Sequence, residues 1–198
     1  MGAQAPLLKN WVTSKVMFSY YIEPKVYRNF LTKEQCDFLI NCKSDISDYI
    51  KTHFGLKDEN NTIKYINSYT KRMSPELGLP ITKICSNKLG IPINKFKGVS
   101  VVKYEKGGFI PKHTDSGDTM PRPYTIIIYL NDDYTGGETH FPMLNKSFKL
   151  NRGDALFFHN RDSSGFDTCT SSHEGKPVIS GQKYVANIWV YDSKEYDI

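Results

Sequence analysis

The spacing of apolar and polar residues changes character near the middle of the chain. In the first half, apolar residues recur at near-helical spacing after Thr32, and Thr32 with Gln35 forms the pattern of a capping box. This pattern predicts a helix over residues 33–42.

A second helix is expected over residues 75–89. Ser74 suits the N-cap, proline is favoured at the first helical position, and Gly90 stands where a left-handed residue ends a helix. Residues 57–62 read as a polar loop, and the segments beside it have no regular pattern.

From about residue 96 onward the pattern becomes a series of short β-rich runs separated by turn-forming residues. Eight strands are predicted, over residues 99–104, 109–113, 124–130, 138–141, 147–150, 155–159, 168–173 and 184–191. Turn residues fall between them, at 107–108, 131–133, 136–137, 151–153 and 181. We expect an α+β fold with a sandwich or jelly-roll core and the helices packed on one face.

The length and composition suit one globular domain. The chain has 198 residues, of which 39% are hydrophobic, and no apolar run reaches the roughly 18 residues of a membrane span. We divide it into a mixed N-terminal part, 1–95, and a β-rich part, 96–192. The first eleven residues lack the pattern of a secretory signal, and Pro6 breaks the myristoylation pattern, so the compartment is left open.

The four cysteines form no CxxC pair, which argues against a thioredoxin-type motif or an all-cysteine zinc site. They are interpreted as ordinary thiols, with a disulfide left open. Charge is uneven: residues 1–112 carry 18 Lys+Arg and 9 Asp+Glu, whereas residues 113–198 carry 8 and 12. The lysines are scattered and lack the Arg-aromatic interleaving of a nucleic-acid surface, so no nucleic-acid partner is expected.

Candidate chemistry lies in the second half, where His113 and Asp115 end a predicted strand. Side chains two residues apart on a strand share a face, so both can point at one metal ion. His173 could add a third ligand. Two histidines and a carboxylate are the ligand set of non-haem iron(II) oxygenases, which leave positions open for a 2-oxo acid and dioxygen. A buried lysine, for which Lys183 is the candidate, would neutralise the far carboxylate of that acid.

Three motifs resemble those of one family, the iron(II)- and 2-oxoglutarate-dependent dioxygenases of the prolyl 4-hydroxylase type. The first is Tyr104-x-x-Gly107 followed by His113-x-Asp115. The second is the segment TIIIYLN followed by GGETHFP, at 125–131 and 136–142. The third is HEGxPVxxGxK, at 173–183, with Trp189 after it. The resemblance covers residues 30–191.

This resemblance implies a double-stranded β-helix and a role for each matching residue. It implies that His113, Asp115 and His173 bind Fe(II), and that Lys183 pairs with the distal carboxylate of 2-oxoglutarate. Tyr104 and Thr139 would bind the same co-substrate, and Trp189 would lie close to the metal. His140 and His159 would not be ligands. The implied activity is hydroxylation of proline in Pro-rich peptides or proteins, with O2 as oxidant and ascorbate as supporting reductant.

Two positions depart from the family pattern. Lys176 stands where a cysteine is usual, and Ile110 stands where a tyrosine near the substrate is often found. Other readings stay open: a related dioxygenase acting on another residue or a small molecule, or a non-catalytic jelly-roll module that binds peptides. A zinc hydrolase is disfavoured because HExxH is absent. The oligomeric state is not predicted.

Overall fold

A computed structural model describes residues 20–43, 49–52, 55–57, 63–117 and 121–192. The expectation for the first eleven residues therefore lies outside the described residues, as do positions 58–62 of the polar loop. Within the described ranges, no helix is both long enough and apolar enough to cross a membrane.

The larger of two facing sheets has seven antiparallel strands. Their spatial order is β1 (Lys25–Tyr27), β12 (Ala155–His159), β8 (Tyr124–Tyr129), β15 (Lys183–Val190), β6 (Ser100–Tyr104), β5 (Tyr69–Arg72) and β2 (Ile50–Lys51). Three of these strands, β1, β2 and β5, come from the first half of the chain, whose irregular segments allowed no strand prediction.

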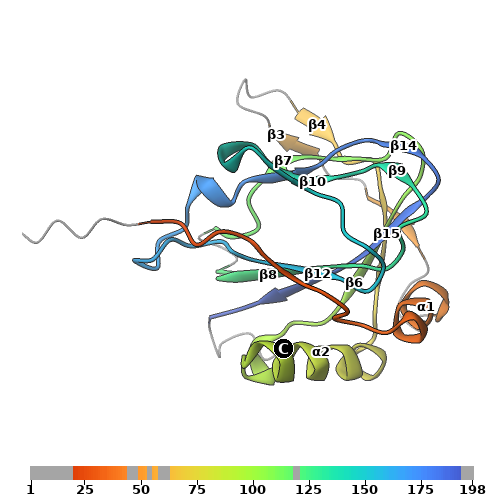
Figure 1. Cartoon of the computed structure of the whole chain (residues 1–198), viewed down its shortest axis with the longest axis horizontal. Helices are drawn as coiled ribbons and strands as arrows, with labels where there is room; N and C mark the ends of the chain where they lie inside the picture. The colour runs from red at the N-terminus through yellow and green to blue at the C-terminus, as the bar shows by residue number, and fades with distance from the viewer. Residues whose placement is uncertain (1–19, 44–48, 53–54, 58–62, 118–120, 193–198) are drawn as a thin grey trace, which may run out of the picture.

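The smaller sheet has four antiparallel strands in the order β11 (Lys146–Phe148), β10 (Thr139–Phe141), β13 (His173–Gly175) and β7 (Ile110–His113). Two short pairs complete the β structure: β9 (Thr135–Gly136) with β14 (Val178–Ser180), and β3 (Gly55–Lys57) with β4 (Ile63–Tyr65). In Figure 1, β7 and β10 lie opposite β8, β12 and β6. The expected α+β fold with a double-stranded β-helix core is confirmed.

Strand β8 shows why the central run of isoleucines is continuous rather than alternating. Ile126 and Ile128 belong to a core cluster with the helices, whereas Ile127 and Tyr129 belong to a second cluster between the two sheets. Because both faces of this strand are covered, every position from 125 to 130 is buried. Each fully buried isoleucine stabilises the fold by roughly 1.5–3 kcal/mol.

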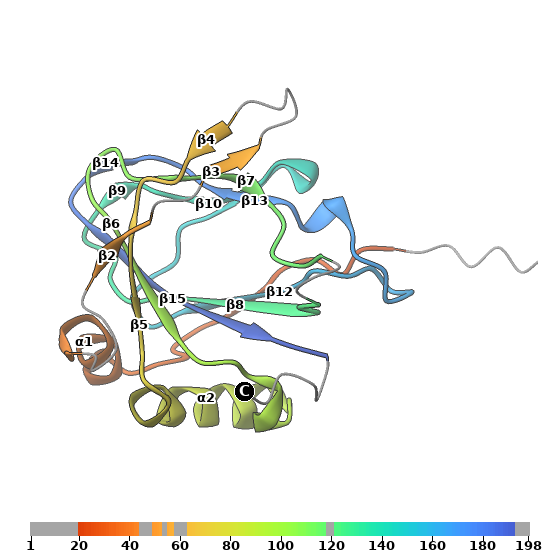
Figure 2. The same cartoon turned by 180° about the vertical axis from the view of Figure 1, so that it is seen from behind.

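Both predicted helices form, and both pack on the outer face of the larger sheet. In α1 (Lys33–Asn41), Thr32 and Gln35 make both hydrogen bonds of the capping box. In α2 (Pro75–Leu89), Ser74 accepts from the backbone N–H of Leu77, and Gly90 is left-handed. Figures 1 and 2 show the two helices together on one side of the sheet.

The predicted strand over 168–173 is wrong in most of its length. Thr168 accepts a hydrogen bond from the backbone of Thr170 and begins a 3-10 helix, Cys169–Ser171, so the strand starts only at His173. The expected turn at 136–137 also differs, because Gly136 ends β9 and pairs with β14. A Cβ at Gly136 would lie 2.6 Å from the carbonyl oxygen of Pro177, so the close approach of β14 requires glycine there.

The cysteines form no disulfide. Cys36 and Cys85 are buried free thiols, Cys42 is partly buried and Cys169 is exposed. They are ordinary core or surface residues, as the sequence indicated.

Candidate metal and co-substrate site

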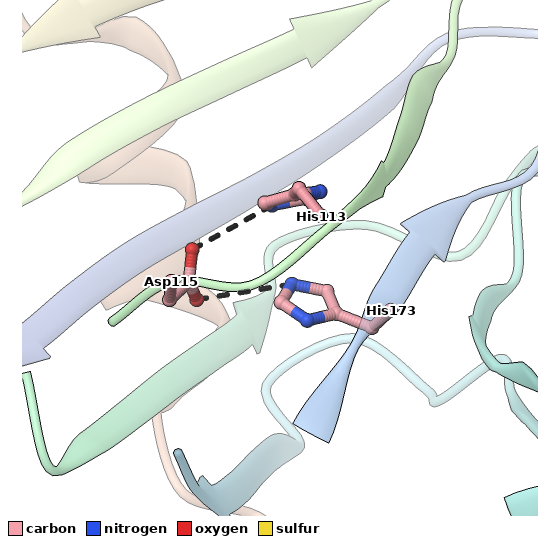
Figure 3. Close-up of side chains that lie close together, drawn as sticks. All are labelled: His113, Asp115 and His173. Carbon is pink, nitrogen blue, oxygen red and sulfur yellow. Dashed lines mark ion pairs between the residues drawn. The ribbon is translucent and has the colours of Figure 1, made fainter. Parts of the chain in front are cut away.

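The smaller sheet and the loop after β7 bring His113, Asp115 and His173 into one cluster. Strand β7 ends at His113 and β13 begins at His173, and these two residues are directly paired across the antiparallel ladder. Asp115 follows β7 by two residues, and its two carboxylate oxygens lie 3.6 Å from Nε2 of His113 and 3.7 Å from Nε2 of His173. Figure 3 shows the three side chains directed toward one another.

Backbone carbonyls orient both imidazoles. Nδ1 of His113 lies 2.8 Å from the Pro111 carbonyl, and Nδ1 of His173 lies 3.1 Å from the Ser171 carbonyl. A carbonyl can only accept a hydrogen bond, so each neutral ring carries its proton on Nδ1. The Nε2 lone pairs are therefore directed at the centre of the cluster, where a metal ion would accept them.

Aromatic packing immobilises His173, which is only 4% exposed. The ring of Phe141 stacks on it, with centroids 5.4 Å apart, and the ring of Phe158 packs edge-on at 4.9 Å. Burial, assisted by the neighbouring His113, lowers the pKa of His173 to about 4. This histidine is neutral at physiological pH, which is the form that binds a metal ion.

Asp115 is held by a hydrogen-bonded chain that starts in the interior. The side-chain amide of buried Asn160 donates to the Thr125 hydroxyl at 2.9 Å, and Thr125 in turn donates to a carboxylate oxygen of Asp115 at 2.8 Å. Burial opposes ionisation, but the two histidines and this hydrogen bond outweigh it and hold the pKa of Asp115 well below its usual range. The carboxylate is anionic at neutral pH.

The net pKa shift of His113 is opposite to that of His173, although the charge of Asp115 acts to raise the pKa of both. Burial alone would lower the pKa of His113, but the hydrogen bond and charge of Asp115 outweigh burial and raise it. The cluster as a whole presents two imidazole nitrogens and one carboxylate with all ligand atoms within 4.8 Å of one another. In the ranges that the structure describes, no other three His, Cys, Asp or Glu side chains are grouped in this way.

Lys183 begins β15 and is buried, with 3% of its surface exposed. Its ammonium donates to the Gly137 carbonyl at 2.7 Å and lies 5.3 Å from the ring centroids of Tyr104 and Tyr129. Burial lowers its pKa from 10.5 to about 8, with Glu138 opposing the shift. Among the ion pairs of the described residues, none includes Lys183.

One cavity of about 560 Å³ joins the lysine to the three-residue cluster. Tyr104 and Thr139, both expected near the co-substrate, line it together with Lys183. Tyr104 is paired with Lys183 across strands β6 and β15. The Thr139 hydroxyl lies 2.7 Å from the Tyr129 hydroxyl, which fixes its orientation in the buried interior. The structure thus brings the expected co-substrate residues to one wall.

Trp189 and Ile110 also line the cavity. The guanidinium of Arg122 lies over the indole of Trp189, with its Cζ atom 4.4 Å from the centroid of the indole ring. The same guanidinium donates to the Tyr191 hydroxyl at 2.8 Å and to the backbone carbonyl of Asp115 at 3.4 Å. Arg122 therefore joins the wall of the cavity to the loop that carries Asp115.

Sequence reasoning did not identify Thr125, Asn160 and Arg122 as neighbours of the cluster. Thr125 stands inside a buried strand pattern, and no periodicity distinguishes it from a core residue. His140 and His159, expected not to be ligands, lie elsewhere: His140 contacts the Ser147 hydroxyl, and His159 packs against the ring of Tyr124.

Comparisons with known proteins agree with this geometry. The family model described as the 2OG-Fe(II) oxygenase superfamily matches residues 99–191. Prolyl 4-hydroxylase 1 of Arabidopsis thaliana is 27% identical, over 83% of this chain and 67% of its own length. A protein of Acanthamoeba polyphaga mimivirus with a provisional prolyl 4-hydroxylase name is 33% identical over 58% of this chain. The match spans only 53% of that mimivirus protein.

A solved structure extends the likeness to the whole fold. The viral collagen prolyl hydroxylase from Paramecium Bursaria Chlorella virus-1, determined with 2OG, superposes with a TM-score of 0.68 at 26% identity. The superposition covers 86% of this chain and 96% of the viral one. Because sequence, fold and metal-ligand cluster agree, residues 99–191 form a domain of the 2OG-Fe(II) oxygenase superfamily, and the chain is similar to prolyl 4-hydroxylases.

Proposed function

We propose that this chain is an iron(II)- and 2-oxoglutarate-dependent prolyl 4-hydroxylase acting on peptides or proteins. The observation that carries the proposal is a single cavity with the His-Asp-His cluster on its wall and a buried lysine beside it. The names of the viral, plant and mimivirus relatives support proline as the hydroxylated residue.

The donor set fits Fe(II). Two neutral imidazole nitrogens and one carboxylate form the facial arrangement that leaves further coordination positions for a co-substrate and O2. In this assignment His113, Asp115 and His173 are the protein ligands. The hydrogen bonds from Asn160 to Thr125 and from Thr125 to Asp115 hold the carboxylate in one orientation, so this ligand is already positioned before a metal ion binds.

The pocket beside the cluster fits 2-oxoglutarate. A dicarboxylic acid bound through one end to iron needs a cation for its far carboxylate, and Lys183 supplies one in a site from which water is largely excluded. Tyr104 and Thr139 add hydroxyl groups on the same wall, as hydrogen-bond partners of the acid. When bound, iron and 2-oxoglutarate would supply the means of activating O2, which is the oxidant: one oxygen atom would enter succinate as the acid loses CO2, and the other would enter the C–H bond as hydroxyl.

The residues of this chain have separate tasks in that reaction. The three ligands hold the metal, and Lys183 orients the acid along the cavity. The apolar wall formed by Ile110, Trp189 and neighbouring side chains leaves a space in which a prolyl ring can lie against the cluster.

Purified protein with Fe(II), 2-oxoglutarate, ascorbate and air should add one oxygen to proline in Pro-rich peptides, detected by mass spectrometry. Succinate should form in step with hydroxylated peptide, and omission of ascorbate should shorten the period of activity. Asp115→Ala supplies the inactive reference, and His140→Ala supplies the matched control. Succinate formation that is the same in the Asp115→Ala protein, or oxygen added only to residues other than proline, would overturn the proposal.

A further inference from the structure

Two residues in the wall of the cavity contain a buried polar atom with no hydrogen-bond partner among the described residues. These atoms are Oδ1 of Asn187 and Nε1 of Trp189. Three other side chains in the described ranges contain such an atom, and none of those three lines the cavity. An unpaired buried polar atom destabilises a fold, so each one in a native protein calls for an explanation. A ligand that enters the cavity would provide it for these two.

Asn187 and Trp189 lie on one face of β15. Side chains two residues apart on a strand share a face, and their Cα atoms are about 6.6 Å apart. Trp189 is the strand partner of Thr125, whose hydroxyl holds Asp115. Lys183 begins the same strand, four residues before Asn187, which is about 13 Å along the strand. The pair therefore lies toward the metal ligands, away from the lysine that receives the far carboxylate of the acid.

The neighbours of Asn187 leave its side-chain oxygen unpaired. The preceding residue on the cavity face of β15 is Val185, and the strand partners of Asn187 are Ile127 on β8 and Ser100 on β6. The two aliphatic side chains have no donor, and the hydroxyl of Ser100 does not bond to this oxygen. The acceptor is therefore available to a ligand that brings its own donor.

The indole N–H of Trp189 is unpaired for a different reason. The guanidinium of Arg122 lies over the face of the ring, with its Cζ atom 4.4 Å from the ring centroid. Nε1 is on the edge of the ring, so this contact orients the indole without using its N–H. The indole is thus held in place with a donor to offer.

One ligand can satisfy both atoms only if it supplies an acceptor and a donor, because an indole nitrogen donates and an amide oxygen accepts. Ionised 2-oxoglutarate has acceptors alone, so it cannot pair with Oδ1 of Asn187. A peptide main chain supplies both, since each residue except proline has an N–H and a C=O. Two residues of a polyproline-II or extended chain span about 6.2–6.8 Å, which matches the spacing between Asn187 and Trp189.

We infer that Asn187 and Trp189 bind the main chain of the substrate, and that the hydroxylated proline needs a neighbour that is not proline. The inference rests on the proposed function and specifies its substrate class. Asn187 accepts from an N–H within two residues of the target, and Trp189 donates to a nearby carbonyl. Because proline has no N–H, an uninterrupted run of prolines satisfies Trp189 but leaves Asn187 unpaired.

The test uses six fluorescein-labelled peptides of equal length. The first has one central proline flanked by alanines. In four others, N-methylalanine replaces the alanine one or two positions before or after the proline, which removes one N–H at a time. The sixth has proline at all five central positions. Binding is measured by anisotropy with Zn²⁺ and 2-oxoglutarate present, in the parent protein and in variants.

One of the four methylated peptides should bind the parent about fivefold more weakly than the first peptide, which is the effect of one hydrogen bond of about 1 kcal/mol. In Asn187→Leu this loss should shrink to less than about twofold, because the acceptor is gone, whereas a steric effect of the methyl group would persist. The preference for the first peptide over the oligoproline peptide should fall by about fivefold in the same variant.

Trp189→Phe keeps an aromatic ring but removes the N–H. It should weaken binding of every peptide by about fivefold and leave the effect of methylation unchanged, because the two hydrogen bonds are separate. If Trp189→Phe binds all six peptides as tightly as the parent, the inference is wrong for the indole.

The stability of the protein without peptide distinguishes a ligand contact from a structural role. Because Oδ1 of Asn187 is unpaired in the empty cavity, Asn187→Leu should leave Tm unchanged or raise it. Asn87→Leu, on the exposed surface of α2, is the matched control and should bind every peptide as the parent does. A lower Tm for Asn187→Leu, or the absence of any methylation effect that depends on Asn187, would overturn the inference.

Hydroxylation of the same peptides with Fe(II) in place of Zn²⁺ tests the proposed function separately. Peptide binding that depends on Asn187, without oxygen added to proline, would support main-chain recognition and contradict the proposed reaction. Hydroxylation of all six peptides at equal rates and with equal affinities would support the reaction and overturn the inference.

Discussion

Replacement of Lys183 by methionine should separate binding of the co-substrate from stability of the fold. Methionine keeps most of the length and apolar volume of the side chain but removes its charge. Burial lowers the pKa of Lys183 from 10.5 to about 8, which corresponds to roughly 3 kcal/mol against the charged form in the folded protein. The hydrogen bond to Gly137 returns about 1 kcal/mol of this.

Without 2-oxoglutarate, the Lys183→Met protein should therefore be more stable than the parent by about 1–3 kcal/mol at pH 7. For a chain of this size that raises Tm by several degrees. Below pH 8 lysine is protonated in both the folded and unfolded states, so the full difference is present. Between pH 8 and 10.5 the folded state loses its proton first, the parent becomes more stable relative to its unfolded state, and the difference should shrink.

With 2-oxoglutarate the order should reverse. Loss of one partner from a desolvated charge pair costs about 2–5 kcal/mol, so the variant should bind the acid at least about 30-fold more weakly. Thermal unfolding with and without 2-oxoglutarate, at pH 7 and pH 9.5, measures both effects, and titration calorimetry gives the affinity. If the Lys183→Met protein is stabilised by 2-oxoglutarate as much as the parent, Lys183 does not bind the acid. If it is less stable than the parent at pH 7, burial of the ammonium does not destabilise the fold.

Three further predictions concern the same site. Alanine in place of His113, Asp115 or His173 should abolish turnover and weaken Fe(II) binding, measured by competition with a chelator. The control variant His140→Ala should have nearly the activity and Fe(II) affinity of the parent. Full activity in one of the three alanine variants would remove that residue from the site. Thr125→Val should keep the fold but weaken Fe(II) binding by about 10- to 100-fold, because Asp115 loses the donor that orients it, and an unchanged metal affinity would contradict this. Affinity for 2-oxoglutarate should fall as the pH rises above about 8, by up to about tenfold per pH unit, because the free protein loses the Lys183 proton. Calorimetric titrations from pH 7 to 9.5 test this. An affinity that does not change with pH would exclude the ammonium as the group that binds the acid.

Several features of this protein follow from local sequence. Thr32 with Gln35, and Ser74 with Gly90, satisfy the end groups of a helix within a few residues, so both helices were predictable almost to the residue. The proximity of His113 and Asp115 is also local, because the two residues are two positions apart, although β7 ends at His113 and Asp115 lies in the loop that follows it. Local sequence therefore indicates two candidate metal ligands and the α+β class of the fold.

Other features depend on residues far apart in the chain. The directly paired positions of His113 and His173 are set by the register between β7 and β13, and no local pattern encodes that register. The predicted strand over 168–173 was wrong because Thr168 bonds to the nearby backbone and favours a 3-10 turn over a ladder that requires a distant partner.

Burial and charge at the site were decided by tertiary structure alone. Sequence motifs made Lys183 the candidate for a buried lysine, but its burial arises only because β15 lies between β6 and β8 and its ammonium reaches the Gly137 carbonyl. Arg72, from the half of the chain outside the recognisable motifs, reaches the cavity only because β5 pairs with β6. Sequence spacing determines which side chains share a strand face, whereas the pairing of strands determines which faces meet. The metal-ligand cluster and the buried lysine beside it require both.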